Sequence, residues 1–275
     1  MSHDPIAIAL VEDVGNGDLT TEFFVDRSAN SSARIFARQE CTLAGAKTAA
    51  ETFRRIDPEL SIVVLRADGD ALGTGDTVLT VHGTTASILT AERVALNFLQ
   101  RLSGIATLTA RFVGAVAGTR AQILDTRKTT PGLRLLEKAA VKAGGGTNHR
   151  MGLHDMVMVK DNHLLADVNI DHLRARIANF KSVHPEIRIE LEADTLDQVK
   201  AFLTLSNVDV ILLDNMSLEE MRIAVAIVSG RVLLEASGGI NLDTVADIAA
   251  TGVDLISVGA LTHSAVAVDF SLELT

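Results

Sequence analysis

From about residue 120 onward, the chain alternates short apolar runs with longer stretches of helical spacing. The runs are rich in Val, Ile and Leu, and a charged or polar residue stands at the end of most of them. Runs of this length are too short for helices and are typical of buried parallel strands. The pattern predicts strands at residues 121–125, 156–160, 187–192, 208–214, 232–235 and 255–259.

Helical stretches lie between these runs. Strand–helix units in series predict a parallel sheet, either open and doubly wound or closed into a barrel. In both architectures ligands bind at the C-terminal ends of the strands. Regular spacing and polar residues inside the strands favour a barrel. The expected helices and their N-caps are 196–205 after Thr195, 218–228 after Ser217 and 242–250 after Asn241.

The run at 187–192 carries the argument for a barrel. Its period-two alternation separates an apolar face from a charged one. An apolar face against outer helices and a charged face toward a solvated barrel interior explain the pattern, and an exposed edge strand is the alternative. The apolar face holds Ile187, Ile189 and Leu191, and the charged face holds Arg188, Glu190 and Glu192.

The first 118 residues have a different pattern. Strands are expected at 33–39, 61–66 and 77–81, and a helical tract follows from residue 85 to about 117 that could break at Ser103-Gly104. The tract has an apolar row with a polar row beside it. The apolar row is Val94, Phe98 and Leu102, and the polar row is Arg93, Asn97 and Arg101.

These patterns predict the domain organisation. We expect a smaller α/β domain at residues 1–118, which includes the linking helices, and a barrel domain at 119–264. The last residues, 265–275, are expected to return as a tail to the first domain.

Composition excludes several classes of function. The chain has 275 residues, 47% of them hydrophobic, with a net charge of −10, and its few aromatic residues are all Phe. A chain this apolar can bury a large core, which argues against disorder. The acidic balance and the lack of Trp and Tyr disfavour a nucleic-acid partner.

Membrane and export functions are also disfavoured. The longest clean apolar run, Ile223–Val228, is far shorter than the roughly 20 residues that span a bilayer. The first residues do not have the basic and apolar segments of a signal peptide. The single cysteine, Cys41, excludes an internal disulfide, and we expect it to be a small buried apolar residue. We therefore expect a cytoplasmic protein.

Basic residues are concentrated in one part of this acidic chain. Residues 120–160 carry eight basic side chains against three acidic ones. A cationic region of this kind is typical of a site for a small polyanion. Arg134, Lys138 and Lys142 have helical spacing and favour a solvated helix face. The other cations follow strand ends or the glycine-rich segment at 144–148. They are Arg127, Lys128, His149, Arg150 and Lys160.

Acidic residues and glycines mark the ends of later strands. Glu192, Asp214 and Glu235 could hold a divalent cation with a phosphorylated substrate, or pair with the lysines and arginines. Two glycine-bearing turns, 237–241 and 258–262, each follow a strand and precede a helix, as in a backbone cradle for phosphate. The sequence holds no P-loop, zinc-protease, dinucleotide-binding or nucleophile-elbow motif.

An ordered set of motifs covers essentially the whole chain. They are EDVGNGDLT at 12–20, ERVALN at 92–97, LDTRKTTPGLR at 124–134, GGGTNHRMGL at 144–153, VKDNH at 159–163, LLDN at 212–215, EASGGI at 235–240 and VGALTH at 258–263. This set resembles the quinolinate phosphoribosyltransferase family, whose members are also called nicotinate-nucleotide pyrophosphorylases (carboxylating).

The resemblance implies a fold and a reaction. The fold is α/β, with a smaller sandwich-like N-terminal α/β domain and an open, incomplete α/β barrel of the type II phosphoribosyltransferases. The expected assembly is a homodimer or a multiple of it. The implied reaction transfers phosphoribosyl from 5-phosphoribosyl 1-diphosphate to quinolinate with Mg2+. Its products are nicotinate mononucleotide, diphosphate and CO2, the entry to NAD by the de novo pathway.

The resemblance also implies residue roles. Quinolinate is expected to contact Arg127, His149, Arg150 and Lys160, with Arg93 reaching the pocket from the neighbouring protomer. The implied catalytic residues are Lys128, Glu192 and Asp214, and the last two are also the expected Mg2+ ligands. The implied contacts of the ribosyl donor are Lys128, Ser237, Gly238 and Gly259.

Three alternatives remain open. The nearest is an enzyme of the same fold that uses nicotinate or another heteroaromatic acid, or a homologue associated with molybdenum transport. The second is a Schiff-base aldolase that uses Lys160, since burial at a strand end could lower the pKa of its amine. The third is a non-catalytic sugar-phosphate-binding protein, which the glycine turns suit.

Overall fold

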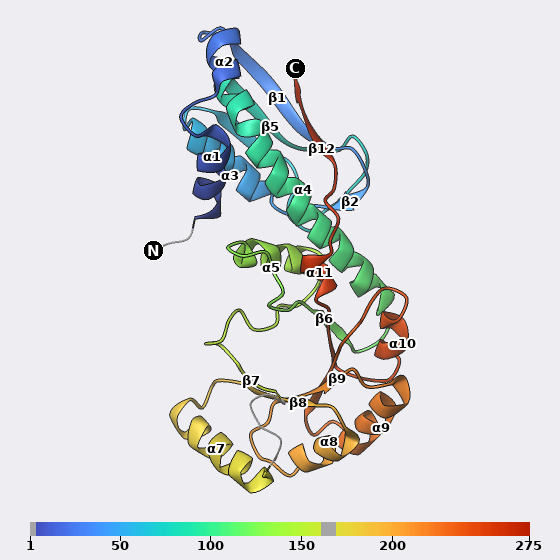
Figure 1. The fold of residues 1–275 in the computed structure, drawn as a ribbon. Coiled ribbons are helices and arrows are strands. Elements are labelled where there is room, and N and C mark those ends of the chain that lie inside the picture. Colours follow the sequence, from blue (N-terminus) through green and yellow to red (C-terminus); the bar gives the residue numbers. More distant parts are fainter. Residues whose placement is uncertain (1–3, 161–168) are drawn as a thin grey trace. The chain divides into compact units, whose positions relative to one another are not determined.

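The computed structural model describes residues 4–160 and 169–275. The chain forms two compact units (Figure 1). The first unit consists of residues up to 110 together with 129–145 and 261–275, and the second consists of 111–128 and 146–260. The expected single domain boundary at residue 118 differs from this division, in which the chain passes between the two units four times. Among the described residues, no helix combines the length and apolar character that crossing a membrane requires.

The first unit is built on an antiparallel sheet in the order β12-β1-β5-β3. The last strand of the chain pairs with β1, so the C-terminal residues complete this sheet. Helices α3 and α4 supply Phe53 and Leu99 to one apolar core with Ile35 and Leu79 of the sheet. Its elements are α1 (Pro5–Val14), α2 (Leu19–Phe24), β1 (Asn30–Ala37), β2 (Cys41–Thr42), α3 (Ala46–Ile56), β3 (Ser61–Val64), β4 (Ala71–Leu72), β5 (Thr77–Thr84), α5 (Arg134–Ala143) and β12 (Phe270–Leu274).

Helix α4 (Thr85–Ala115) is continuous, and the break considered at Ser103-Gly104 is wrong. Gly104 has another role, because a Cβ atom there would lie 2.2 Å from the carbonyl oxygen of Val266. The glycine therefore lets the C-terminal segment pack directly against the helix backbone. The predicted apolar row of α4 is buried, as expected for a core-facing stripe.

The second unit is built on a six-stranded parallel sheet in the order β6-β11-β10-β9-β8-β7. Strands β6 and β7 form its two edges, so the sheet is open, and helices α7 to α10 follow its outer side (Figure 1). All six predicted strands are present. The elements are β6 (Gln122–Leu124), β7 (Val157–Val159), α7 (Ile170–Val183), β8 (Ile189–Ala193), α8 (Leu196–Phe202), β9 (Val210–Asp214), α9 (Leu218–Val228), β10 (Leu233–Ser237), α10 (Val245–Ala249), β11 (Leu255–Ser257) and, across the boundary of the units, α11 (Ala260–His263).

Two of the three predicted helix caps are confirmed. Thr195 and Ser217 each form a capping box with the residue three positions later. Asn241 does not cap a helix, because its side chain accepts the N–H groups of Asp243 and Thr244 in a turn. Helix α10 begins only after Thr244.

Strand β8 decides between the two interpretations of its alternating pattern. The exposed-edge alternative is wrong, because β8 lies between β9 and β7. Both faces of the strand are buried, and Glu190 and Glu192 are 0% and 7% exposed. The two glutamates of the predicted charged face are therefore buried rather than solvated, whereas Arg188 lies just before β8 and is exposed.

Candidate functional site

The predicted site residues of the second unit follow the C-terminal ends of its strands. Parallel pairing places these ends along one edge of the sheet. Asp214 at the end of β9 pairs in register with Ser237 at the end of β10. Glu192 of β8 lies opposite Leu212 of β9. The last residue of β11, Ser257, lies opposite Leu124, three residues before Arg127.

A cavity of about 520 Å³ lies beside strand β7 and helix α7. Arg127, Arg150 and Lys160 all line it, so three of the four cations expected to bind one small anion share a cavity. Arg176 of α7 adds a fourth cation that the sequence did not indicate. Apolar side chains complete a wall suited to an aromatic ring. They are Leu153, Met156, Val157, Met158, Val159, Leu173, Ile177, Phe180 and Ile189.

Arg150 is held against strand β7. Its guanidinium donates to the carbonyl oxygen of Met156 at 3.3 Å and lies 3.4 Å from the sulfur of Met158. Burial lowers the pKa of Arg150, and the positive charge of Arg127 lowers it further. Two guanidinium groups that repel each other at a cavity wall favour an anion between them.

Lys160 directly follows strand β7 and forms an ion pair with the carboxylate of Glu192. The Glu192 side chain is 8% exposed, whereas Lys160 keeps 41% of its side chain accessible. The residues directly after Lys160 in the VKDNH motif, 161–163, lie outside the described residues. Lys160 thus joins the cationic cavity to the acidic ends of the neighbouring strands.

The turn after β10 requires a glycine. Gly238 has φ of +103°, and a Cβ atom there would lie 2.1 Å from the side-chain oxygen of Asn215. The backbone N–H of Asn215 donates to the carbonyl oxygen of Ser237 at 3.0 Å, and its side-chain amide donates to Asp214 at 2.8 Å. Asp214, Asn215, Ser237 and Gly238 therefore form one connected corner of the strand edge.

The remaining predicted residues lie on neighbouring loops or in the first unit. Lys128 and Arg127 are exposed just after β6, and Gly259 follows β11. The carboxylates of Glu192 and Asp214 offer the oxygen donors that suit Mg2+. Arg93 lies on α4 in the first unit and is exposed. Lys138 is 1% exposed, so the solvated face predicted for it is wrong.

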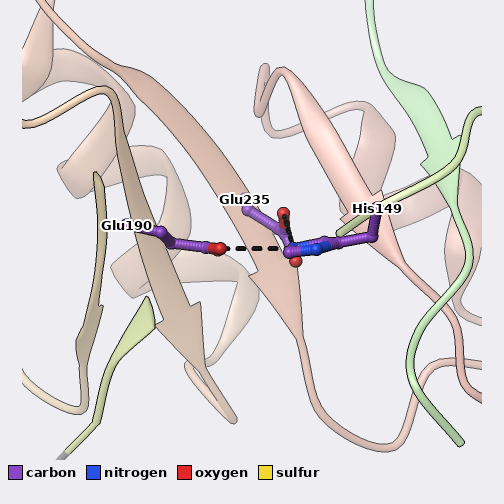
Figure 2. A group of neighbouring side chains, drawn as sticks. All are labelled: His149, Glu190 and Glu235. Atoms are coloured by element: carbon purple, nitrogen blue, oxygen red, sulfur yellow. Dashed lines mark ion pairs between the residues drawn. The ribbon is translucent and has the colours of Figure 1, made fainter. Parts of the chain in front are cut away.

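The His149 side chain points toward two buried carboxylates, those of Glu190 and Glu235 (Figure 2). Its Nε2 atom lies 3.2 Å from a carboxylate oxygen of Glu190 and 3.3 Å from one of Glu235. The three side chains are 7%, 0% and 2% exposed. Nδ1 of the ring accepts the backbone N–H of Arg150 at 2.7 Å. His149 is not among the residues that line the cavity beside β7 and α7.

Burial and charge oppose each other in this cluster. Burial lowers the pKa of His149, but the carboxylates of Glu190 and Glu235 raise it more, to about 10. Burial raises the pKa of Glu190, and the charge of Glu235 adds to that rise although His149 counteracts it. The two carboxylates therefore favour a proton on the ring nitrogen of His149 that faces them.

Asp125 fixes the backbone next to this cluster. Its fully buried carboxylate accepts the amide of Asn148 at 2.6 Å and the backbone N–H of His149 at 2.8 Å. Thr147 is bridged to Leu124, so the loop enters the cluster along the edge of β6. The sequence marked Asp125, Glu190 and Glu235 only as acids in or after strands. Their link to His149 depends on strand register and on the course of the loop, which the sequence did not reveal.

Comparisons with known proteins agree over nearly the whole chain. The family model "Quinolinate phosphoribosyl transferase, C-terminal domain" matches residues 105–273, and the model of the N-terminal domain matches residues 18–103. A probable nicotinate-nucleotide pyrophosphorylase [carboxylating] of Bacillus subtilis is 41% identical over 96% of this chain and 90% of its own length. The enzyme of the same name from Mycobacterium leprae is 41% identical over 99% and 97%.

Solved structures show the same similarity. NadC from Streptococcus pyogenes has a TM-score of 0.91 and 41% identity, and the match covers 98% of this chain and 95% of that one. The nicotinate-nucleotide pyrophosphorylase from Francisella tularensis has a TM-score of 0.91 and 37% identity, with coverage of 98% and 94%. The predicted fold class, with a smaller sheet domain and a parallel α/β unit, is therefore confirmed.

Proposed function

Since this chain belongs to the quinolinate phosphoribosyltransferase family, we propose that its second unit is the catalytic unit in which that reaction takes place. The chain transfers phosphoribosyl from 5-phosphoribosyl 1-diphosphate to quinolinate with decarboxylation. The products are nicotinate mononucleotide, diphosphate and CO2, which makes the chain an enzyme of NAD biosynthesis. The observation that carries the site assignment is the convergence of Arg127, Arg150 and Lys160 on one cavity.

Quinolinate fits this cavity by charge and shape. The compound is a flat ring with two adjacent carboxylates, and the cavity combines apolar walls with cations. The guanidinium groups of Arg127 and Arg150 suit carboxylates, which accept paired hydrogen bonds, and Lys160 adds a point charge. In our proposal the partner subunit's Arg93 completes the cationic set. His149 belongs to the same site through its contact with Arg150.

The ribosyl donor is assigned to the adjoining strand ends. Lys128 and the turns at Ser237, Gly238 and Gly259 supply a cation and backbone N–H groups for its phosphates. Glu192 and Asp214 would hold Mg2+, whose chemistry here is to neutralise the diphosphate leaving group. The same two carboxylates face the positive charge that develops on the ribose as its bond to diphosphate breaks.

The reaction then needs few further groups. The ring nitrogen of quinolinate forms a bond to the anomeric carbon while the bond to diphosphate breaks. The carboxylate next to the nitrogen leaves as CO2, its bonding electrons are stabilised by the pyridinium nitrogen, and a proton takes its place. No protein base is required for this loss. The main contribution of the chain is the alignment of two bound anions.

We also propose a homodimer and a cytoplasmic location. Support for the dimer comes from helices α1 and α2, where Val11, Leu19, Phe23 and Phe24 are 72–85% exposed. Exposed apolar side chains of this size are typical of an interface with another chain. The cytoplasmic location agrees with a free, buried Cys41, since reduced thiols are usual in that compartment.

One assay tests the proposed function. Purified protein is incubated with quinolinate, the ribosyl donor and Mg2+, and nicotinate mononucleotide and CO2 are quantified together. We expect equal amounts of the two products and none when nicotinate replaces quinolinate. Product from nicotinate without CO2 would instead favour the enzyme of the same fold that uses a monocarboxylate. Borohydride trapping of Lys160 with a carbonyl substrate would favour the aldolase.

A further inference from the structure

The cluster of His149, Glu190 and Glu235 is short of hydrogen bonds. Among the buried side-chain atoms of the described residues, those without a hydrogen-bond partner are both carboxylate oxygens of Glu190 and one of Glu235. Unsatisfied buried carboxylates are costly, so a cluster that keeps them needs a compensating role. The contact with His149 is an ion pair at 3.2 and 3.3 Å.

A metal ion is one group that such a cluster can hold, since its three ligand atoms lie within 4.8 Å of one another. The hydrogen bond at the other ring nitrogen argues against this. Nδ1 accepts the backbone N–H of Arg150, so the ring proton lies on Nε2, which faces the two carboxylates. A metal bound at Nε2 would require the opposite arrangement. The geometry therefore favours a proton, not a metal, between the ring and the carboxylates.

The ring connects the acidic pair to the cavity. On one side it faces Glu190 and Glu235, and on the other it accepts the backbone N–H of Arg150, whose side chain lines the cavity. The negative charge of Glu190 also acts on the Arg150 guanidinium and opposes the repulsion from Arg127. Both carboxylates thus contact the ring that bonds to Arg150, and Glu190 also acts on the Arg150 guanidinium through its charge.

We propose that Glu190 and Glu235 are positioning residues for quinolinate binding: they hold the His149 ring, and the ring fixes Arg150 at the cavity wall. This inference rests on the proposed function, because it takes quinolinate as the anion that Arg150 binds. Neither carboxylate lines the cavity, so their effect reaches the substrate only through His149 and Arg150. They should therefore influence the affinity for quinolinate and leave the ribosyl donor unaffected.

Glu235→Gln tests this, because it keeps the size of the side chain and removes its charge. We expect the KM for quinolinate to rise about tenfold, while kcat and the KM for the ribosyl donor change by less than about threefold. The matched control is Glu186→Gln, which changes an exposed glutamate just before β8 and should match the wild-type enzyme. An equal rise in both KM values, or an unchanged KM for quinolinate, would overturn the proposal.

A second set of variants tests the route through His149. If the ring transmits the effect, Glu235→Gln should raise the KM no further in a His149→Gln background. Full additivity would overturn the proposal. Glu190→Gln should repeat the result of Glu235→Gln. If both glutamate variants fail to fold while His149→Gln folds normally, the pair is structural and the proposal is wrong.

Two further outcomes separate the possible failures. A wild-type enzyme that forms no product from quinolinate contradicts the proposed function itself. An active wild-type enzyme with unaltered kinetics in Glu235→Gln contradicts only the positioning role. Elemental analysis covers the metal alternative. One zinc or manganese ion per wild-type chain, absent from Glu235→Gln, would replace the positioning role by a metal site.

Discussion

Two buried charged clusters, one around Glu137 in the first unit and one around His149 in the second, are built differently. In the first unit, Arg101 donates to Glu137 at 3.0 and 3.2 Å and to the backbone oxygens of Thr262 and Ala265. Thr130 gives Glu137 two further hydrogen bonds, at 3.0 and 2.7 Å. In the second unit, the carboxylates around His149 leave three oxygens without a hydrogen bond.

This difference separates a structural cluster from a functional one. A buried charge that is fully hydrogen-bonded ties segments together, and here Glu137 joins α5 to the loop at Thr130 and, through Arg101, to α4 and the C-terminal segment. A buried charge that lacks hydrogen bonds stabilises the fold poorly. Its link to Arg150, which lines the cavity proposed for quinolinate, supports a role in binding instead.

The largest effect on catalysis is expected for a residue that lines the cavity. Lys160→Ala removes one cation of the proposed quinolinate set and leaves the carboxylate of Glu192 buried without its ion pair. We expect kcat/KM for quinolinate to fall by roughly 10³-fold. Steady-state kinetics would measure it, with Lys200→Ala on the exposed side of α8 as the control. Activity close to that of the wild type would remove Lys160 from the site.

The next largest effect is expected on the stability of the first unit, in the cluster of Arg101, Thr130 and Glu137. Arg101→Met leaves Glu137 buried without its cation, and we expect the free energy of unfolding of the first unit to fall by about 3 kcal/mol. Urea denaturation followed by circular dichroism would show it as an earlier transition. Arg111→Met changes an exposed residue of the same helix and should have little effect. Unchanged stability would show that the hydrogen bonds around Glu137 do not hold the segments together.

The sequence predicted the strands of the second unit better than it predicted the buried contacts of either unit. The six strands of the second unit could be predicted because short Val- and Leu-rich runs have few alternatives, and parallel pairing then placed Lys160, Glu192 and Asp214 on one edge. The continuity of α4 could not be predicted. The sequence suggested a break at Gly104, but this glycine is needed for a close contact with Val266, which lies far along the chain. For the same reason the burial of Lys138 and the ring position of His149 depended on distant contacts.

A subunit-mixing experiment extends the comparison to the assembly. The proposal places Arg93 of the first unit in the site of a partner subunit, so Arg93→Ala and Lys160→Ala chains are each inactive alone. After exchange of subunits, half of the dimers are mixed and each has one complete site, which restores roughly a quarter of the wild-type activity. No recovery, with mixed dimers detected by native mass spectrometry, would place Arg93 outside the partner's site.

A smaller effect distinguishes the clusters by pH. Because the carboxylates of Glu190 and Glu235 outweigh burial and raise the pKa of His149 to about 10, the folded chain holds this proton more tightly than the unfolded chain. The resulting stabilisation is fully present below the ordinary histidine pKa and is lost as the pH rises toward 10. The stability difference between wild type and His149→Gln should therefore change over this range. A constant difference would show that His149 does not bind the proton more tightly in the folded chain.

Glu137→Gln and Glu235→Gln, compared side by side, test the central claim most directly. For each variant, the free energy of unfolding and the KM for quinolinate are measured under the same conditions. We predict that Glu137→Gln loses about 2 kcal/mol of stability with a nearly unchanged KM, whereas Glu235→Gln keeps its stability within about 1 kcal/mol and binds quinolinate more weakly. If Glu235→Gln instead loses stability and keeps its KM, the unsatisfied cluster belongs to the fold and not to the substrate site.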